Sequence, residues 1–214
     1  MSLRASRDPL ADVGVKAGML IGGTYRLQSV LGVGGMGVVA LALDERLERL
    51  VAIKFVKSEL MSLPKMQQLF AEEARAMARL NHRNVLAVYA FGDHGDTPYF
   101  VMEYVDGQTA EQWLLGRPPG NLPSVEDVVK LIEQACTGVE AIHATGTIHR
   151  DLKPSNLLID GSFRVAVGDF GLARAPDPSE PHGPLVGTAA YMAPEAAFGE
   201  ESPREEARDI YALG

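Results

Sequence analysis

The stretch HRDLKPSN, residues 149–156, decides how the rest of the chain is interpreted. It follows a predicted helix, and Pro154 prevents that helix from continuing because proline has no backbone N–H to donate. The resulting loop can direct Asp151, Lys153 and Asn156 toward one place. A carboxylate can take or orient a hydroxyl proton, a lysine can neutralise phosphate oxygens, and an amide oxygen can ligate a hard cation. The loop therefore predicts a phosphoryl-transfer site.

A glycine cluster, GVGGMGVV at residues 32–39, lies between two predicted strands. Gly32, Gly34 and Gly37 form the pattern G-x-G-x-x-G, and Val39 follows it. Glycine lets backbone N–H groups approach a phosphate closely. The pattern alone is weak evidence for a phosphate-binding loop, because glycine-rich hairpins are common. A dinucleotide-binding unit would need a helix after the glycines. A second strand pattern follows here, which favours a loop folded over a nucleotide.

Lys54 lies inside the apolar strand pattern VAIKFV, residues 51–56. A lysine that snorkels from a sheet edge is the ordinary explanation, whereas a buried lysine needs a counter-ion. Residues 64–80 have helical periodicity, and Glu73 falls on the apolar stripe of that helix, while Glu72 points to the opposite side. The geometry therefore predicts an ion pair between Lys54 and Glu73.

Two further motifs follow the HRDLKPSN loop. Asp169-Phe170-Gly171 comes directly after a short predicted strand, and this order of carboxylate, aromatic ring and glycine suits a metal ligand held by a packing anchor. Residues 172–187 are rich in Pro, Asp, Ser, Glu and Gly, which is typical of a loop. The sequence GTAAYMAPE, residues 187–195, closes that loop.

Composition narrows the class of protein. The 214 residues are 46% hydrophobic, enough for a substantial core in one domain or two small lobes. A net charge of −8 and a pI of about 5.1 argue against a general nucleic-acid binder. We expect no membrane segment, because no apolar run is long enough to span a bilayer. Residues 1–23 are interpreted as a polar leader and not as a secretion signal.

Cys136, the single cysteine, cannot form a disulfide within the chain, which suits a reducing cytoplasm. It falls on the apolar stripe of the helix predicted over residues 125–144, so we expect it to be buried. Ser124 is the predicted N-cap of this helix.

These pieces, in this order, resemble the eukaryotic-like serine/threonine protein kinases. The Gly-Gly-Met-Gly sequence of the glycine cluster is similar to that of bacterial members. The resemblance covers residues 24–214 and implies an α+β, bilobal fold. Residues 24–104 would form an N-lobe with an antiparallel sheet and helix C. Residues 105–214 would form a mainly helical, incomplete C-lobe.

The resemblance implies transfer of the γ-phosphoryl group of ATP to a serine or threonine hydroxyl of a protein. Asp151 would act as the base, and Lys153 would neutralise the γ-phosphoryl group. Asn156 and Asp169 would hold Mg²⁺, with Mn²⁺ as an alternative. Thr188 would bond to the catalytic aspartate and lysine, as in serine/threonine kinases.

A nucleotide site between the two lobes is also implied. Lys54, paired with Glu73, would hold the α- and β-phosphates beneath the glycine loop. Met102 would be the gatekeeper, and the backbones of Glu103 and Val105 would meet the adenine edge. Four apolar side chains would enclose the ring: Leu31, Val39, Ala52 and Leu158.

The end of the chain departs from the family pattern. Residues 209–214, DIYALG, resemble the start of helix F, whereas family members continue through further helices. We therefore expect exposed apolar surface in the C-lobe unless another chain completes it. A truncated, non-catalytic kinase-fold module that binds nucleotide or a partner is the alternative function. A small-molecule kinase of related fold is a third alternative, against which Thr188 and the APE motif at 193–195 argue.

Overall fold

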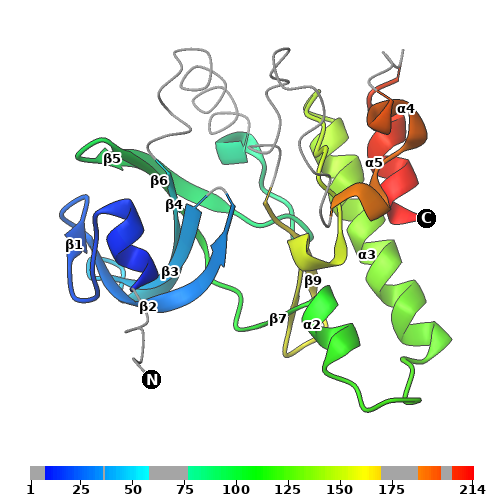
Figure 1. Ribbon diagram of the computed structural model, residues 1–214, viewed down its shortest axis with the longest axis horizontal. Helices are drawn as coiled ribbons and strands as arrows, with labels where there is room; N and C mark the ends of the chain where they lie inside the picture. The colour runs from blue at the N-terminus through cyan, green and yellow to red at the C-terminus, as the bar shows by residue number, and fades with distance from the viewer. Residues whose placement is uncertain (1–7, 36, 58–76, 170–187, 199–203) are drawn as a thin grey trace, which may run out of the picture. The chain divides into compact units, whose positions relative to one another are not determined.

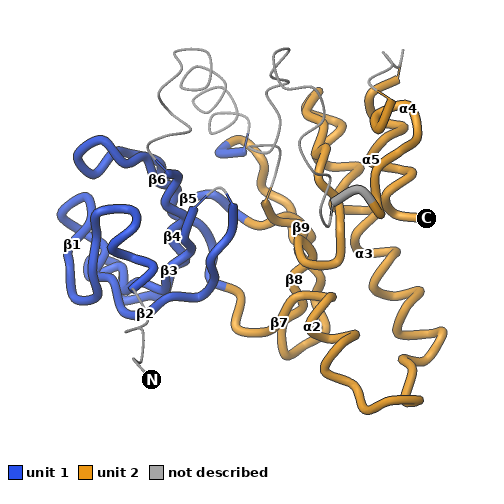
Figure 2. Tube along the Cα trace, in the orientation of Figure 1, with its two compact units in different colours: residues 1–78, 87–104 blue, residues 79–86, 105–214 orange. Residues whose placement is uncertain are grey.

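The computed structural model describes residues 8–35, 37–57, 77–169, 188–198 and 204–214 (Figure 1). The chain divides into two compact units (Figure 2). Unit 1 comprises Met1–Ala78 and Ala87–Tyr104, and unit 2 comprises Arg79–Leu86 and Val105–Gly214.

Unit 1 is built on a six-stranded antiparallel sheet with the strand order β1-β2-β3-β4-β6-β5. Because successive side chains of a strand point to opposite faces, the sheet has two different surfaces. Val51, Ile53 and Phe55 belong to a buried apolar core on one face, so Ala52 and Lys54 lie on the other. The strands are β1 Leu20–Ile21, β2 Tyr25–Gly34, β3 Gly37–Asp44, β4 Arg49–Val56, β5 Val88–His94 and β6 Thr97–Glu103.

Residues 8–23, which we predicted to be a polar leader, contribute to the core of unit 1. A 3-10 helix, η1 Pro9–Val13, begins where the Asp8 side chain accepts the Leu10 N–H at 3.1 Å. It contacts β2 and β3, and β1 then adds to the sheet beside β2. The prediction was wrong because the apolar residues of this segment are separated by charged and small ones, which hid their common face. Four of them are buried: Leu10, Val13, Val15 and Ile21.

Unit 2 combines a small sheet with helices (Figure 1). Its strands are β7 Gly107–Thr109, β8 Leu157–Asp160 and β9 Val165–Val167. Its longer helix, α3, spans Val125–His143 and packs on β9 and α5. Ser124 caps α3 as predicted, because its hydroxyl accepts the Asp127 N–H at 3.0 Å. The other elements are α2 Ala110–Leu115, η3 Pro154–Asn156, η4 Thr188–Tyr191, α4 Pro194–Ala197 and α5 Glu206–Leu213.

Cys136 is exposed, contrary to the prediction. The reason is the way α3 packs. Gly138 lies so close to the segment before β5 that an added Cβ would be 2.3 Å from the Asn84 carbonyl oxygen. This approach turns the packed face of α3 toward Gly138 and away from Cys136. The buried residues of the helix are Leu131, Ala135, Gly138, Val139 and Ile142.

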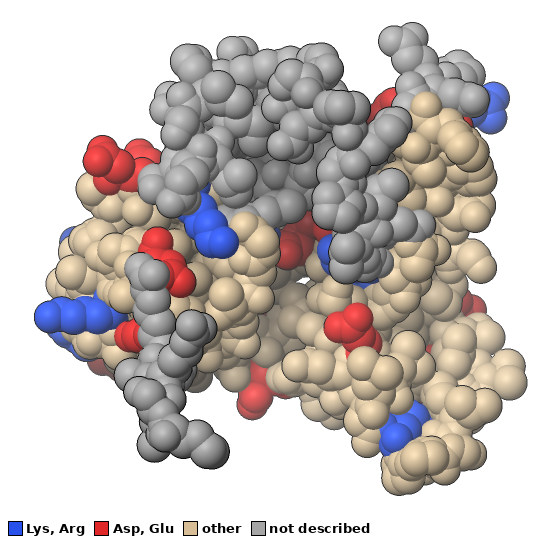
Figure 3. All heavy atoms as spheres, in the orientation of Figure 1, with Lys and Arg blue, Asp and Glu red and all other residues tan. Residues whose placement is uncertain are grey.

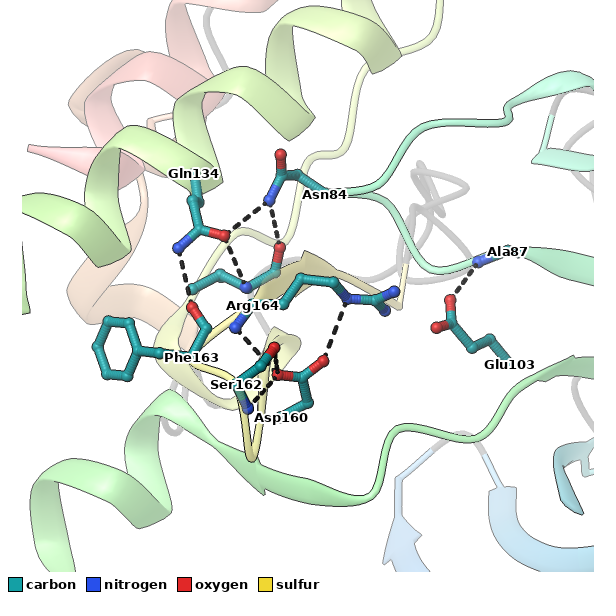
Figure 4. A network of polar contacts seen from close by, with 9 residues as sticks. Asn84, Ala87, Glu103, Gln134, Asp160, Ser162, Phe163 and Arg164 are labelled. Atoms are coloured by element: carbon teal, nitrogen blue, oxygen red, sulfur yellow. Dashed lines mark hydrogen bonds and ion pairs between the residues drawn. The ribbon is translucent and has the colours of Figure 1, made fainter.

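The segment 79–86 belongs to unit 2, although we predicted that residues 24–104 form one lobe. The Val167 N–H donates to the Asn84 carbonyl at 2.9 Å. The buried Asn84 amide donates to the Val165 carbonyl at 2.7 Å and to Gln134 Oε1 at 3.1 Å (Figure 4). The segment is therefore attached to β9 and α3 by hydrogen bonds that hydrophobic periodicity does not indicate.

Charged side chains of both signs are interspersed on the surface shown in Figure 3. Among the described residues, no helix combines the length and the apolar character that crossing a bilayer requires.

Candidate phosphoryl-transfer site

The loop at residues 149–156, called the catalytic loop below, brings its three predicted polar residues together. Lys153 Nζ lies 2.7 Å from Asp151 Oδ2. The Asn156 amide donates to the Asp151 carbonyl at 2.7 Å and to Asp151 Oδ2 at 3.2 Å. One carboxylate oxygen is therefore held by an ammonium and an amide.

The other carboxylate oxygen of this aspartate is available. Asp151 Oδ1 is buried, and no hydrogen-bond donor reaches it within the described part of the chain. A buried polar atom without a partner is costly and calls for an explanation. A hydroxyl group that approached Asp151 Oδ1 would supply the missing donor, and the oxygen could take or orient its proton.

Proline explains the shape of the catalytic loop. Pro154 occupies the first position of η3, where its missing N–H is not needed. The Asn156 N–H closes this turn on the Lys153 carbonyl at 2.9 Å. As a result Asn156 is buried and its side chain is turned back toward Asp151.

Asp209, in α5, holds the start of the catalytic loop. Its carboxylate is 1% exposed and accepts the backbone N–H groups of His149 and Arg150, both at 2.7 Å. His143 Nε2, at the end of α3, lies 2.8 Å from Asp209 Oδ2. Arg150 has φ 67°, an uncommon backbone conformation for a residue with a side chain. Sequence reasoning missed His143, because no local pattern sets it apart.

His149 links Asp151 to the segment before Asp169. The Asp151 N–H donates to His149 Nδ1 at 3.2 Å, so Nε2 carries the proton and donates to the Gly168 carbonyl at 2.9 Å. Burial lowers the pKa of His149 below its usual range, although the Gly168 hydrogen bond and nearby carboxylates act in the opposite direction. His149 is therefore a neutral connector.

A backbone hydrogen bond joins the two segments that carry the predicted cation ligands, Asn156 and Asp169. The Gly168 N–H donates to the Asn156 carbonyl at 2.9 Å, which places Asp169 one residue from that bond. Asp169 itself has φ 60°, a backbone conformation that residues other than glycine seldom adopt. A carboxylate and a carboxamide oxygen are hard donors that fit Mg²⁺, which takes few protein ligands and completes its shell with water and phosphate. The described residues contain no cluster of three or more His, Cys, Asp or Glu side chains able to hold a metal.

In unit 1, the sheet face opposite the apolar core carries four of the predicted nucleotide contacts. Val39 is paired with Lys54 and Ala52 is paired with Met102 in the register of β3, β4 and β6. Paired residues of antiparallel strands lie on the same face. Lys54 is 7% exposed, so it is buried and does not snorkel from a sheet edge.

The glycines of the cluster are not equivalent. A Cβ on Gly37 would lie 1.8 Å from the Phe55 carbonyl oxygen, so the packing of β3 on β4 requires glycine there. Gly32 and Gly34 have no described atom within 4 Å of such a Cβ. The sheet therefore explains Gly37 without a ligand, and leaves Gly32 and Gly34 unexplained.

The remaining predicted nucleotide contacts occupy different surroundings. The Glu103 N–H donates to the Ala87 carbonyl at 2.8 Å, and Glu103 Oε2 accepts the Ala87 N–H at 3.4 Å (Figure 4). The Glu103 N–H and side chain are thus engaged within the protein. Leu31 is exposed at the end of β2 in unit 1, whereas Val105 and Leu158 are half-buried in unit 2.

Several predictions fall outside the described residues. These are residues 64–76 of the predicted helix, which include Glu73, the Phe170-Gly171 pair and the loop at 172–187. Of Thr188 only the backbone is described, at the start of η4. The Lys54–Glu73 ion pair and the Thr188 hydrogen bonds therefore stay predictions.

Comparison with known proteins identifies the family. The protein kinase domain profile matches residues 25–214. The serine/threonine-protein kinase PknA of Mycobacterium tuberculosis is 40% identical over 206 residues, covering 93% of this chain and 47% of PknA. PknB of Mycobacterium leprae is 39% identical over 197 residues, covering 89% of this chain and 31% of PknB. The chain thus spans less than half the length of these relatives.

Solved structures agree. A mutant PknI kinase domain of Mycobacterium tuberculosis superimposes with a TM-score of 0.77 at 27% identity, covering 94% of this chain and 73% of that domain. The predicted α+β kinase fold, with an antiparallel-sheet unit and a partial helical one, is confirmed. The chain belongs to the protein kinase family, and its sequence and fold are those of a bacterial serine/threonine protein kinase domain.

Proposed function

We propose that this chain transfers the γ-phosphoryl group of ATP to serine or threonine hydroxyls of a protein. The observation that supports this proposal most is how the Asp151 carboxylate is held. Lys153 and Asn156 bind one of its oxygens, while the other is buried without a partner within the described residues. Asp151 Oδ1 would accept or orient the proton of the attacking hydroxyl. Lys153 would neutralise charge on the transferred group.

Asn156 and Asp169 would hold Mg²⁺, or Mn²⁺ in its place. The metal, when bound, neutralises phosphate charge and fixes the geometry of in-line transfer. Lys54 would hold the α- and β-phosphates with Glu73 as its counter-ion, and the backbone at Gly32 and Gly34 would approach the phosphates. Gly37 would act indirectly, by letting β3 pack on β4.

The adenine ring would lie between Leu31, Val39, Ala52 and Leu158. Met102 would limit access beside the ring, and the backbones of Glu103 and Val105 would meet its edge. Serine or threonine as the acceptor is supported by Lys153, two residues after Asp151, and by Thr188, which would bond to both. We place this activity in the cytoplasm, where a single cysteine suits the reducing conditions.

The test is transfer of labelled γ-phosphate to the chain itself and to a generic basic protein. Asp151→Asn should lower the rate by about 10²–10⁴-fold while MgATP binding is retained, because general-base catalysis contributes this much. Equal rates for wild type and Asp151→Asn would refute the kinase proposal. Binding of MgATP without any Asp151-dependent transfer would select the non-catalytic nucleotide-binding module.

An apolar groove in unit 2 supports a second proposal, that a partner chain completes this unit. The groove has a volume of about 670 Å³ and is lined mainly by apolar side chains of α2, α3, the catalytic loop and α5. Leu114, Val128 and Ile210 line it and are themselves exposed. An open groove of this size resembles a binding cavity more than a finished surface.

Sedimentation at rising protein concentration tests whether a second copy is that partner. Leu114→Glu should abolish self-association, while Leu47→Glu, on an exposed turn of unit 1, should not. Binding of an apolar dye to the groove should fall in Leu114→Glu alone. A monomeric wild type whose dye binding is unchanged by Leu114→Glu would contradict the proposal.

A further inference from the structure

A glutamate that no sequence motif indicates bridges two arginines beside the catalytic loop. Glu205 immediately precedes α5, and its Oε1 lies 3.1 Å from Arg208 Nη1. Its Oε2 lies 3.7 Å from Arg150 Nη2, in the residue before Asp151. We propose that Glu205 is a positioning residue for the base Asp151 and acts through Arg150. This inference rests on the proposed kinase function.

Arg150 needs positioning because its backbone is in an uncommon conformation. Its φ of 67° lies in the left-handed region, which residues with a Cβ occupy at a cost. Asp209 holds the Arg150 N–H at 2.7 Å, and Glu205 attracts the guanidinium. Both carboxylates come from one short stretch of chain, so the start of α5 restrains Arg150 by its backbone and by its side chain.

Removal of the Glu205 charge would act on the loop in two ways. Two guanidinium groups now attracted by one carboxylate would repel each other, and Arg150, whose side chain is 44% exposed, would gain rotational freedom. The next residue is Asp151, whose N–H bonds to His149 and whose carboxylate must face the acceptor. Small displacements of a reacting group lower the rate without affecting substrate binding elsewhere.

The ordinary alternative is that Glu205 only stabilises the start of α5, as an acidic residue near a helix N-terminus does. Glu206 is the matched control: it lies in the first turn of the same helix, is exposed, and forms no hydrogen bond or ion pair with the catalytic loop within the described residues. A helix-dipole role predicts equal effects of Glu205→Gln and Glu206→Gln. A positioning role predicts that only Glu205→Gln affects the loop.

Kinetics give the first test. In Glu205→Gln, kcat should fall by about two- to five-fold with KM for ATP unchanged, because partly exposed ion pairs are worth this much. The difference should shrink at high salt, since exposed charges are screened. In an Arg150→Gln background, Glu205→Gln should cause no further loss. A kcat equal to that of Glu206→Gln, or a full additional loss in the Arg150→Gln background, would overturn the inference.

Amide hydrogen exchange separates this inference from the proposed function. Glu205→Gln should speed exchange at the backbone amides of residues 149–153 several-fold, and Glu206→Gln should not, whether or not transfer is observed. Wild type without Asp151-dependent transfer would refute the kinase function while leaving the loop measurement decisive. Unchanged exchange in Glu205→Gln, together with an active wild type, would refute the positioning role alone.

Discussion

Replacement of Leu10 tests whether the segment before the kinase profile is part of the folded domain. Leu10 is 1% exposed and belongs, with Val13, Val15 and Ile21, to the buried apolar core on one face of the unit 1 sheet. Leu10→Ala should lower the free energy of unfolding by about 3 kcal/mol, from lost burial and the cavity left behind. For a chain of this size, that corresponds to a melting temperature lower by about 6–12 °C.

The assay is urea unfolding followed by two signals. Circular dichroism follows both units, whereas the single tryptophan, Trp113, lies in α2 and reports unit 2. Leu10→Ala should shift the dichroism midpoint, with unit 1 unfolding first. Leu47→Ala is the control, because Leu47 is 64% exposed on the same unit and should cost less than about 0.5 kcal/mol.

A larger change follows from the same packing. The four buried side chains of residues 8–23 contribute about 1.5–3 kcal/mol each, or roughly 6–12 kcal/mol together. This is comparable to the whole stability of a typical domain, about 5–15 kcal/mol. A chain beginning at residue 24, close to the start of the kinase profile, should therefore fail to fold unit 1. An equal urea midpoint for Leu10→Ala and Leu47→Ala would refute this reasoning.

Three further predictions concern Gly37, His149 and Asn84. Gly37→Ala should destabilise unit 1 by about 3 kcal/mol in urea unfolding, because the added Cβ would meet the Phe55 carbonyl. Gly34→Ala should leave the free energy of unfolding unchanged, because its Cβ would meet no described atom. It should instead weaken ATP binding measured by calorimetry. Burial lowers the pKa of His149 in the folded state. Above about pH 6.5 the neutral imidazole therefore does not reduce the free energy of unfolding. Below that pH the unfolded chain takes up a proton that the folded chain does not. Stability should then fall by up to about 1.4 kcal/mol per pH unit, and urea midpoints of His149→Gln should lack this component. Asn84→Ala should lower the free energy of unfolding of unit 2 by about 1–3 kcal/mol, because it removes the donors to Val165 and Gln134. Urea unfolding followed by Trp113 fluorescence measures this change, and a loss below about 0.5 kcal/mol would contradict that role.

The catalytic loop could be predicted from sequence because its chemistry is local. Asp151, Lys153 and Asn156 lie within six residues, and Pro154 fixes the turn that joins them. Sheet strands were predicted for the same reason: their alternation is visible in a short window.

Contacts between distant parts of the chain were not predictable. The contacts of Glu205 with Arg150 and of His143 with Asp209 depend on the placement of α5 and α3. Cys136 was assigned to the wrong side of its helix, because periodicity gives a stripe but not the neighbour against which the stripe packs. Gly37 matched a phosphate-binding pattern, yet its closest constraint is the backbone of the adjacent strand.

The two hydrogen-bonding roles of Asn156 constrain how such a site can evolve. Its side chain restrains the Asp151 carboxylate, while its carbonyl anchors the residue before Asp169. In the proposed site, affinity for a cation and alignment of the base would therefore share one residue, and selection could not adjust either property there without altering the other.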